Sequence, residues 1–299
     1  FRKRVSEYVK PFLTQNVPSL FSNLKALYTD SEKVQIIEDV FLSYANTLEK
    51  SNKYPDAEDA EAPTTYLWTL LYLAFHYDKL GQLQTALETI NKAIKHTPTA
   101  IELYMAKARI LKHSGAYQEA ANAMDIARKM DLADRYLNTK ATKYLLRADR
   151  TEEAADILYL FAKDQEQKLN IADMQGSNFE ISSGDSFLRQ NKIGRALKSY
   201  GYVISHFEEI RNDQYDFHAY CLRKYMMRNY VEYLRYNDHL ESHNYYFRAA
   251  TGVLTALLAL HAKPSLQNQN STAEDQALFD QLVEKRRLKK DEDPFGEIG

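Results

Sequence analysis

Four side chains on one short stretch combine the types and the spacing that anion binding requires. Counted from Lys140, the side chains of Lys143, Tyr144 and Arg147 follow after three, four and seven residues, so they share one face of a helix. Cations gathered in this way repel one another unless an anion lies between them. Phosphate or carboxylate oxygens would accept several charge-assisted hydrogen bonds there, and Tyr144 would add an uncharged donor. We therefore predict a site for an anion that carries many negative charges.

The same charges also have a plainer interpretation. Basic side chains on a helix are often solvated surface charges, and acidic residues of the same chain could balance them without any ligand. Four aspartates lie nearby in the sequence: Asp125, Asp131, Asp134 and Asp149. The residues alone leave both interpretations open. A free-standing adaptor that grips the acidic tails of other proteins in a basic groove is the alternative function.

The elements that would position these residues form a repeat. Small residues recur every 34 positions, as in tetratricopeptide repeats: Ala74, Gly81, Ala86 and Ala93 return as Ala108, Gly115, Ala120 and Ala127. Small side chains let the helices of a hairpin approach closely, and glycine suits the turn between them because it adopts positive φ easily. A third copy keeps the phase through Leu145, Ala154 and Leu158. We predict an all-α fold, a tetratricopeptide-type α–α superhelix built as a solenoid of helical hairpins.

In such a solenoid the first helix of each hairpin lines a concave groove. Placing the copies in register aligns two columns, Lys79, His113, Arg147 and Arg189 in one, and Phe75, Arg109, Lys143 and Asp185 in the other. Close to these columns in sequence lie Lys112, Arg135, Lys140 and Tyr144. A groove lined in this way would attract carboxylates, phosphates or an acidic protein surface, and its low-dielectric walls would strengthen the attraction.

The repeat also divides the chain. We expect helical repeats over residues 1–53, an acidic linker over 54–64 and three tetratricopeptide-like repeats over 65–164. The fourth packing alanine, Ala196, follows Ala154 by 42 residues instead of 34, so we place an insertion at 165–176. Degenerate helical repeats over 177–262 and a charged, partly ordered tail over 263–299 complete the prediction. Neither end has the polar cap that a solenoid needs, which favours a piece of a longer array.

Composition and motifs argue against several functions. The net charge of −2 does not suit a protein that coats nucleic acid, and no apolar run approaches the roughly 18 residues of a membrane span. One cysteine, Cys221, permits no internal disulfide and favours a reducing compartment such as the cytoplasm. The sequence has no phosphate-binding glycine loop, zinc-protease motif or nucleophile elbow. His239 and His243 lack further ligands at a metal-binding spacing. We therefore expect neither catalysis nor a metal site.

Several longer stretches are specific enough to suggest a family. They include Pro63-Thr64-Thr65 with Leu67-Trp68-Thr69, Lys107-Ala108-Arg109, Asp134-Arg135-Tyr136, Ala172-Asp173-Met174-Gln175 and Asp213-Gln214-Tyr215-Asp216-Phe217-His218. In these stretches the chain resembles the auxiliary subunit of the NatA N-terminal acetyltransferase. The resemblance covers nearly the whole chain and implies the middle to C-terminal portion of that subunit.

The resemblance implies a non-catalytic scaffold, which forms a heterodimer with a catalytic acetyltransferase subunit and helps to place it at the ribosome. It also implies inositol hexakisphosphate as a structural ligand between the subunits, held by a basic cluster around Arg135, Tyr136, Lys140 and Lys143. Many members carry a tryptophan shortly after the Met174-Gln175 pair, where this chain has Asn178. Together, the two arguments predict a polyphosphate site that comprises Arg135, Tyr136, Lys140, Lys143, Tyr144, Arg147 and Lys112.

Overall fold

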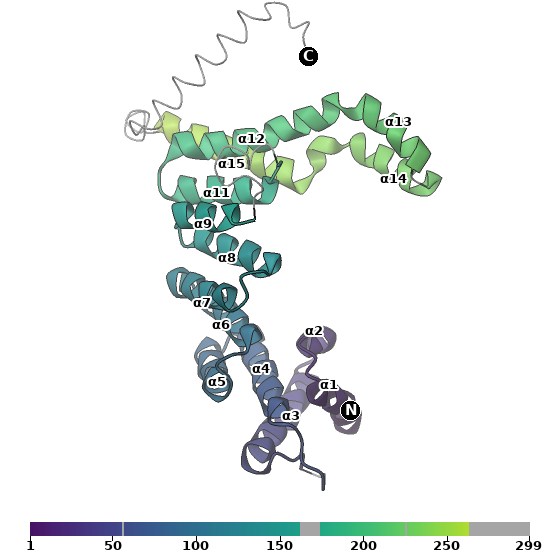
Figure 1. Cartoon of the computed structure of the whole chain (residues 1–299), viewed down its shortest axis with the longest axis vertical. Coiled ribbons are helices and arrows are strands. Elements are labelled where there is room, and N and C mark those ends of the chain that lie inside the picture. Colours follow the sequence, from purple (N-terminus) through teal and green to yellow (C-terminus); the bar gives the residue numbers. More distant parts are fainter. Residues whose placement is uncertain (56, 162–173, 225, 263–299) are drawn as a thin grey trace, which may run out of the picture. The chain divides into compact units, whose positions relative to one another are not determined.

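The computed structural model describes residues 1–55, 57–161, 174–224 and 226–262, without the side chains of 214–217. Every regular element in those ranges is a helix, so the predicted all-α fold class is confirmed (Figure 1). The chain divides into two compact units, Phe1–Ala162 and Lys163–Gly299, which are described separately below. None of the described helices is long and apolar enough to cross a membrane.

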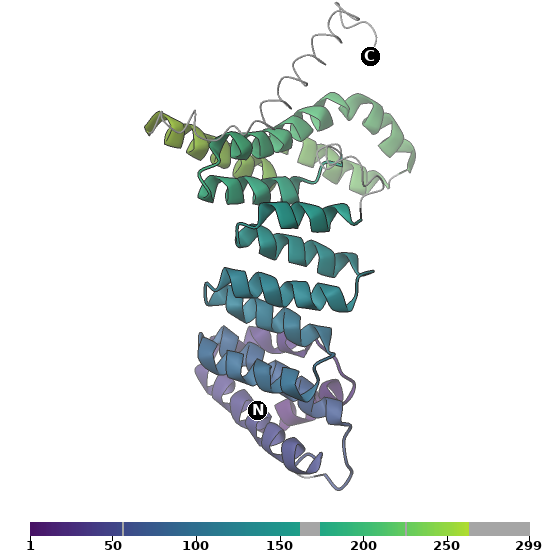
Figure 2. The same ribbon diagram turned by 60° about the vertical axis from the view of Figure 1, so that its left-hand side comes forward.

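The first unit consists of a short N-terminal group of helices and three helical hairpins. The N-terminal group is α1 (Arg2–Thr14), α2 (Leu20–Leu24), the 3₁₀ helix η1 (Lys25–Thr29) and α3 (Ser31–Ser51). The hairpins are α4–α5 (Pro63–Lys79 and Leu83–His96), α6–α7 (Ile101–His113 and Tyr117–Met130) and α8–α9 (Arg135–Arg147 and Thr151–Tyr159). From α3 to α9, each helix packs against the next one along the chain, which Figure 2 shows as a regular stack.

The first described helices of the second unit form a further hairpin, α11 (Ser177–Arg189) and α12 (Ile193–Asn212). It continues with α13 (Gln214–Lys224), α14 (Met227–Asn237), the 3₁₀ helix η2 (Leu240–Ser242) and α15 (Asn244–Ala262). Helix α15 packs against both α12 and α11. Most of the predicted insertion, residues 165–173, and the predicted tail, 263–299, lie outside the described residues, and the domain boundaries stay a prediction.

The packing alanines lie where the repeat predicts. Ala86, Ala154 and Ala196 have no exposed surface and Ala120 is 1% exposed, each of them in the second helix of its hairpin. A side chain of one carbon allows neighbouring helix backbones to approach closely, whereas a larger one would separate them. The 34-residue period therefore marks real helix–helix contacts.

The turn between the two helices of a hairpin has one conformation in all four hairpins of the described residues. Gly81 and Gly115 adopt φ values of 77° and 81°, as predicted, and the equivalent residues of the next hairpins, Asp149 and Asn191, both adopt 60°. In each turn the following amide donates to a carbonyl five residues back, as from Gln82 N to Tyr77 O at 2.9 Å. This is the Schellman pattern of a helix end. Because aspartate and asparagine also tolerate positive φ, the turn survives the loss of glycine.

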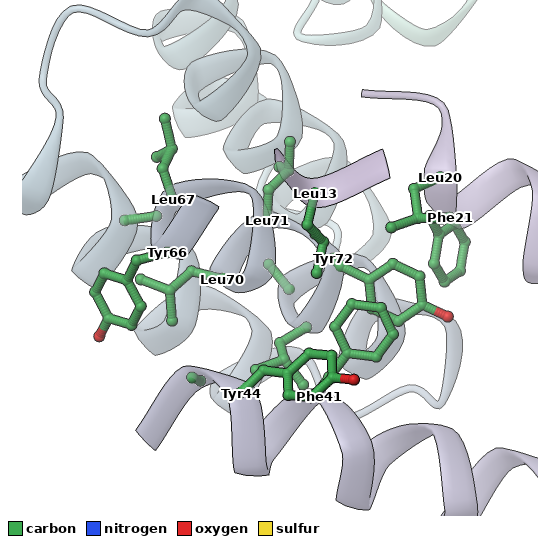
Figure 3. Packing of buried hydrophobic residues seen from close by; sticks show 14 of the residues in the cluster. Leu13, Leu20, Phe21, Phe41, Tyr44, Tyr66, Leu67, Leu70, Leu71 and Tyr72 are labelled. Atoms are coloured by element: carbon green, nitrogen blue, oxygen red, sulfur yellow. The ribbon is translucent and has the colours of Figure 1, made fainter. Parts of the chain in front are cut away.

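The core of the first unit surrounds α4. This helix is buried on nearly all sides, with α1, α3, α5 and α6 among its neighbours. At the contact with α3 the rings of Phe41 and Tyr72 stack at 3.7 Å between centroids and 4° between planes (Figure 3). The face of α3 that packs against α4 is apolar and buried, since Ile37, Phe41 and Leu48 are at most 1% exposed. An anchored α4 gives the later hairpins a rigid support.

Candidate functional site

Helix α8 carries the basic residues singled out in the sequence. It begins after Asp134, whose side chain accepts hydrogen bonds from the amides of Tyr136 at 2.7 Å and Leu137 at 3.4 Å. Such a cap satisfies amides that have no partner within the helix. One face of α8 is buried through residues such as Leu137 and Leu145. The opposite face is therefore left to the charged side chains.

Cations from α6 and α8 meet on that face. The pKa of Lys112 lies below its usual value of 10.5, first because the amine is partly buried and then because the positive charges of Arg147, Arg109 and Lys140 oppose its protonation. Burial raises the pKa of Tyr144, while Arg147 and Arg109 act in the opposite direction. Arg109, Lys140 and Tyr144 also line one pocket, which places the phenol beside two of these cations. We call Arg109, Lys112, Lys140, Tyr144 and Arg147 the cationic cluster.

One carboxylate reaches the edge of the cationic cluster. The side chain of Asp78, at the end of α4, is only 1% exposed. It accepts a hydrogen bond from Nδ1 of His113 at 2.6 Å and lies 3.4 Å from Nε of Arg109. The guanidinium of Arg109 also lies over the ring of Phe75, 5.0 Å from its centroid. A buried carboxylate with two basic partners fixes the position of Arg109, a role for Asp78 that the repeat pattern did not reveal.

The aspartates that could have balanced these charges are mostly engaged elsewhere. Asp125 pairs with Arg128 and Lys129, both at 2.7 Å. Asp131 accepts from the amide of Ala133, and Asp134 caps α8. An ion pair requires a nitrogen and a carboxylate oxygen within 4.0 Å of each other. Within the described residues, no carboxylate oxygen is that close to the charged nitrogens of Lys112, Lys140 or Arg147. Neutralisation by these neighbours is therefore a poor account of the cluster.

The other predicted site residues occupy the exposed surface of α8. Tyr136 is 55% exposed, and Nζ of Lys140 lies 5.2 Å from the centroid of its ring. Arg135 is exposed in the first turn, with its guanidinium 5.6 Å from the ring of Phe161. Lys143 is exposed on the same helix. Of the predicted site residues, the structure thus brings Lys112, Lys140, Tyr144 and Arg147 together. Arg109, which the predicted site did not include, joins them, and Tyr136 contacts the group through Lys140.

Within the first unit, members of both predicted columns make contacts between hairpins. Phe75 and Arg109 are in contact, as their column requires, and His113 reaches Asp78 of the preceding hairpin. Arg189 and Asp185 belong to the second unit, whose position relative to the first is not described. Asn178 also lies there, in the first turn of α11, where its carbonyl accepts a hydrogen bond from Ser182 at 2.7 Å.

A pocket of about 270 Å³ adjoins the cationic cluster. Its walls come from the first helices of the three hairpins, α4, α6 and α8, with Met124 of α7 and Pro18 of the turn before α2. The lining consists of Pro18, Leu71, Phe75, Glu102, Met105, Ala106, Arg109, Met124, Tyr136, Lys140 and Tyr144. The first helices therefore line a hollow that is apolar inside and mainly basic at its rim.

Comparisons with known proteins agree on one family. A family model described as N-terminal acetyltransferase A, auxiliary subunit, matches residues 1–293. The NatA complex auxiliary subunit NAA15 of Arabidopsis thaliana is 42% identical over 290 residues, which are 97% of this chain and 32% of that protein. N-alpha-acetyltransferase 16, a NatA auxiliary subunit of Homo sapiens, is 40% identical over 277 residues, 92% of this chain and 32% of that protein.

A solved structure gives the same answer. The structure of Naa15/Naa10 bound to HypK-THB matches with a TM-score of 0.78 and 36% identity, over 93% of this chain and 41% of the matched chain. The chain thus spans about a third of the length of the curated relatives given above. These relatives are named as auxiliary subunits, not as catalytic ones. By its sequence and its helical hairpins, the chain belongs to the family of NatA auxiliary subunits.

Proposed function

We propose that this chain is part of a non-catalytic scaffold that binds and positions the catalytic subunit of a co-translational N-terminal acetyltransferase. The family assignment supports this function, as does the solved relative in which Naa15 is together with Naa10. An array of packed hairpins offers a long concave surface, which suits a folded partner. We further propose that the full-length protein acts in the cytoplasm and contacts the ribosome through parts beyond this chain.

The cationic cluster is the observation that carries the finer proposal, an inositol polyphosphate such as inositol hexakisphosphate at the interface with the catalytic subunit. Lys112, Lys140 and Arg147, which form no ion pair among the described residues, fit a ligand with many phosphate oxygens. Tyr144 fits as an uncharged donor. When bound, the ligand would supply the negative charge that converts their mutual repulsion into charge-assisted hydrogen bonds. Arg135, Tyr136 and Lys143 would extend the same surface along α8.

The burial of Lys112 supports this assignment. A polar ammonium that is partly removed from water, beside three other cations, weakens the folded state unless a counter-charge is present. Proteins tolerate such an arrangement at binding sites, where the ligand supplies the compensation. The same surface would also attract the negatively charged face of a partner protein, so ligand and partner would reinforce each other's binding.

Co-purification tests the scaffold function. The chain would be co-expressed with a catalytic acetyltransferase subunit from the same host and purified through a tag on the chain alone. We expect a stoichiometric complex that survives gel filtration, and no peptide acetylation by the chain when it is purified without the partner. A free-standing adaptor for acidic tails would instead release the catalytic subunit and retain short acidic peptides. Turnover by the isolated chain would overturn the proposal.

A further inference from the structure

The pocket beside the cationic cluster is chemically divided along α6. Glu102, Met105, Ala106 and Arg109 line it and share one face of the helix at spacings of three and four residues. Glu102 and Arg109 are seven residues apart, which corresponds to about 10 Å along the helix axis. The pocket thus has an acidic end, an apolar middle and a basic end.

The basic end has a guanidinium held by neighbouring side chains, and apolar side chains line the middle. Asp78 and Phe75 hold the guanidinium of Arg109, and Lys140 of α8 joins it at the same rim. The floor is formed by Leu71 and Met124, at most 3% exposed, with the side chain of Met105 beside them. A phosphate group gains nothing from such a floor, because it would lose its hydration against apolar atoms. The floor therefore suits a different kind of ligand.

We propose that this pocket binds a segment of a partner protein in which one apolar side chain lies between an acidic and a basic residue. The apolar side chain enters the pocket, the carboxylate faces Arg109 and Lys140, and the basic group faces Glu102. The volume of about 270 Å³ is below the roughly 300–1,000 Å³ of small-molecule sites, so it suits one side chain and not a whole cofactor. Charge complementarity at both ends fixes the direction of the segment. The inference does not depend on the proposed polyphosphate.

Short capped peptides test the proposal on the whole chain. Two fluorescent peptides serve as probes, one with the sequence Glu-Ala-Ala-Leu-Ala-Ala-Ala-Lys and one with the reverse sequence. Their binding is measured by fluorescence anisotropy. Replacing the leucine of the peptide by alanine removes the group that enters the pocket. For the peptide order that binds more tightly, we expect this change to weaken binding at least about tenfold, because no large apolar side chain then enters the pocket.

A charge exchange at the acidic end tests the direction. Glu102 is exposed in the first turn of α6, so Glu102→Lys leaves the core intact, which a thermal unfolding curve verifies. We expect this variant to bind the probe about threefold more weakly. It should bind a peptide with glutamate in place of the lysine more tightly than the unaltered chain does. Equal affinity of both proteins for both peptides would overturn the proposal.

A variant of the cationic cluster separates the pocket from general attraction to positive charge. Arg147 belongs to the cluster but does not line the pocket. Arg147→Gln should therefore weaken the binding of inositol hexakisphosphate, if that ligand binds, and change the affinity for the probe much less than Glu102→Lys does. Loss of probe binding in Arg147→Gln, without a preference for leucine over alanine in the peptide, would show that no side chain enters the pocket. Failure of inositol hexakisphosphate to bind would count against the polyphosphate alone.

Discussion

A Cβ atom added to Gly184 would lie 2.6 Å from the ring of Tyr200. The tyrosine is 1% exposed and also lies against Gly252 of α15, where an added Cβ would clash with the same ring. Its hydroxyl donates to Asp185 at 2.8 Å. Two glycines on neighbouring helices thus create the space for one aromatic ring between α11, α12 and α15.

This close approach predicts the effect of a single methyl group. Gly184→Ala should lower the free energy of unfolding by about 1–3 kcal/mol, because the fixed ring of Tyr200 leaves no room for the added carbon. Gly201→Ala in α12 is the matched control, since nothing lies within 4 Å of its added Cβ. It should stabilise the helix by about 0.5–1 kcal/mol. Urea unfolding of the two variants would settle the point, and equal effects would contradict it.

The turn residues predict a purely conformational effect. Nothing lies within 4 Å of a Cβ added to Gly115, whose φ is 81°. Gly115→Ala should therefore cost about 1–2 kcal/mol through backbone strain alone. Gly115→Asn should cost less, because the equivalent position of a later hairpin holds Asn191 at φ 60°. The midpoints of urea unfolding of both variants would be compared with that of Gly194→Ala, which changes a helical glycine that has free space. An asparagine variant no more stable than the alanine variant would contradict the explanation.

The polyphosphate proposal predicts a charge-dependent affinity. In calorimetric titrations of the complex, inositol hexakisphosphate should bind, and the affinity should fall as salt screens the site. Lys143→Glu should weaken it at least about tenfold, since charge-assisted hydrogen bonds of a phosphate are lost and a repulsion is added. Lys95→Glu, an exposed change on α5 outside the cluster, is the control. If the two variants bind alike, the assignment to α8 is wrong.

The lowered pKa of Lys112 predicts proton uptake on binding. Burial and the neighbouring cations shift its pKa below 10.5, so the free protein holds this proton less tightly than the unfolded chain does. A bound polyanion favours the charged amine and raises the pKa again. At alkaline pH the observed heat of binding should therefore depend on the ionisation enthalpy of the buffer. Lys112→Arg, which stays charged, should remove that dependence, whereas a buffer-independent heat in the unaltered chain would contradict the prediction.

Local spacing explains why much of the fold could be read from the sequence. The 34-residue period, the packing alanines and the glycine turns depend on contacts within a hairpin or between adjacent ones, so each copy repeats the same signal. The same reasoning placed Lys140, Tyr144 and Arg147 on one helical face, because a helix has a fixed number of residues per turn. The turn at Asp149 could not be recognised from the sequence in this way, because its residue is not a glycine. Its backbone nevertheless adopts the same positive φ.

Contacts between helices that are distant in the chain were decided only by the tertiary structure. The pairing of Asp78 with Arg109 and His113 joins α4 to α6, and the repeat spacing did not indicate that a carboxylate at position 78 would contact these two residues. The pocket likewise needs walls from α4, α6 and α8 and a turn at Pro18. The sequence by itself determined the repeat, the helical faces and the family resemblance, because these arise from short-range geometry. Which cations remain without a carboxylate depends on how the helices pack, and packing is a property of the folded chain as a whole.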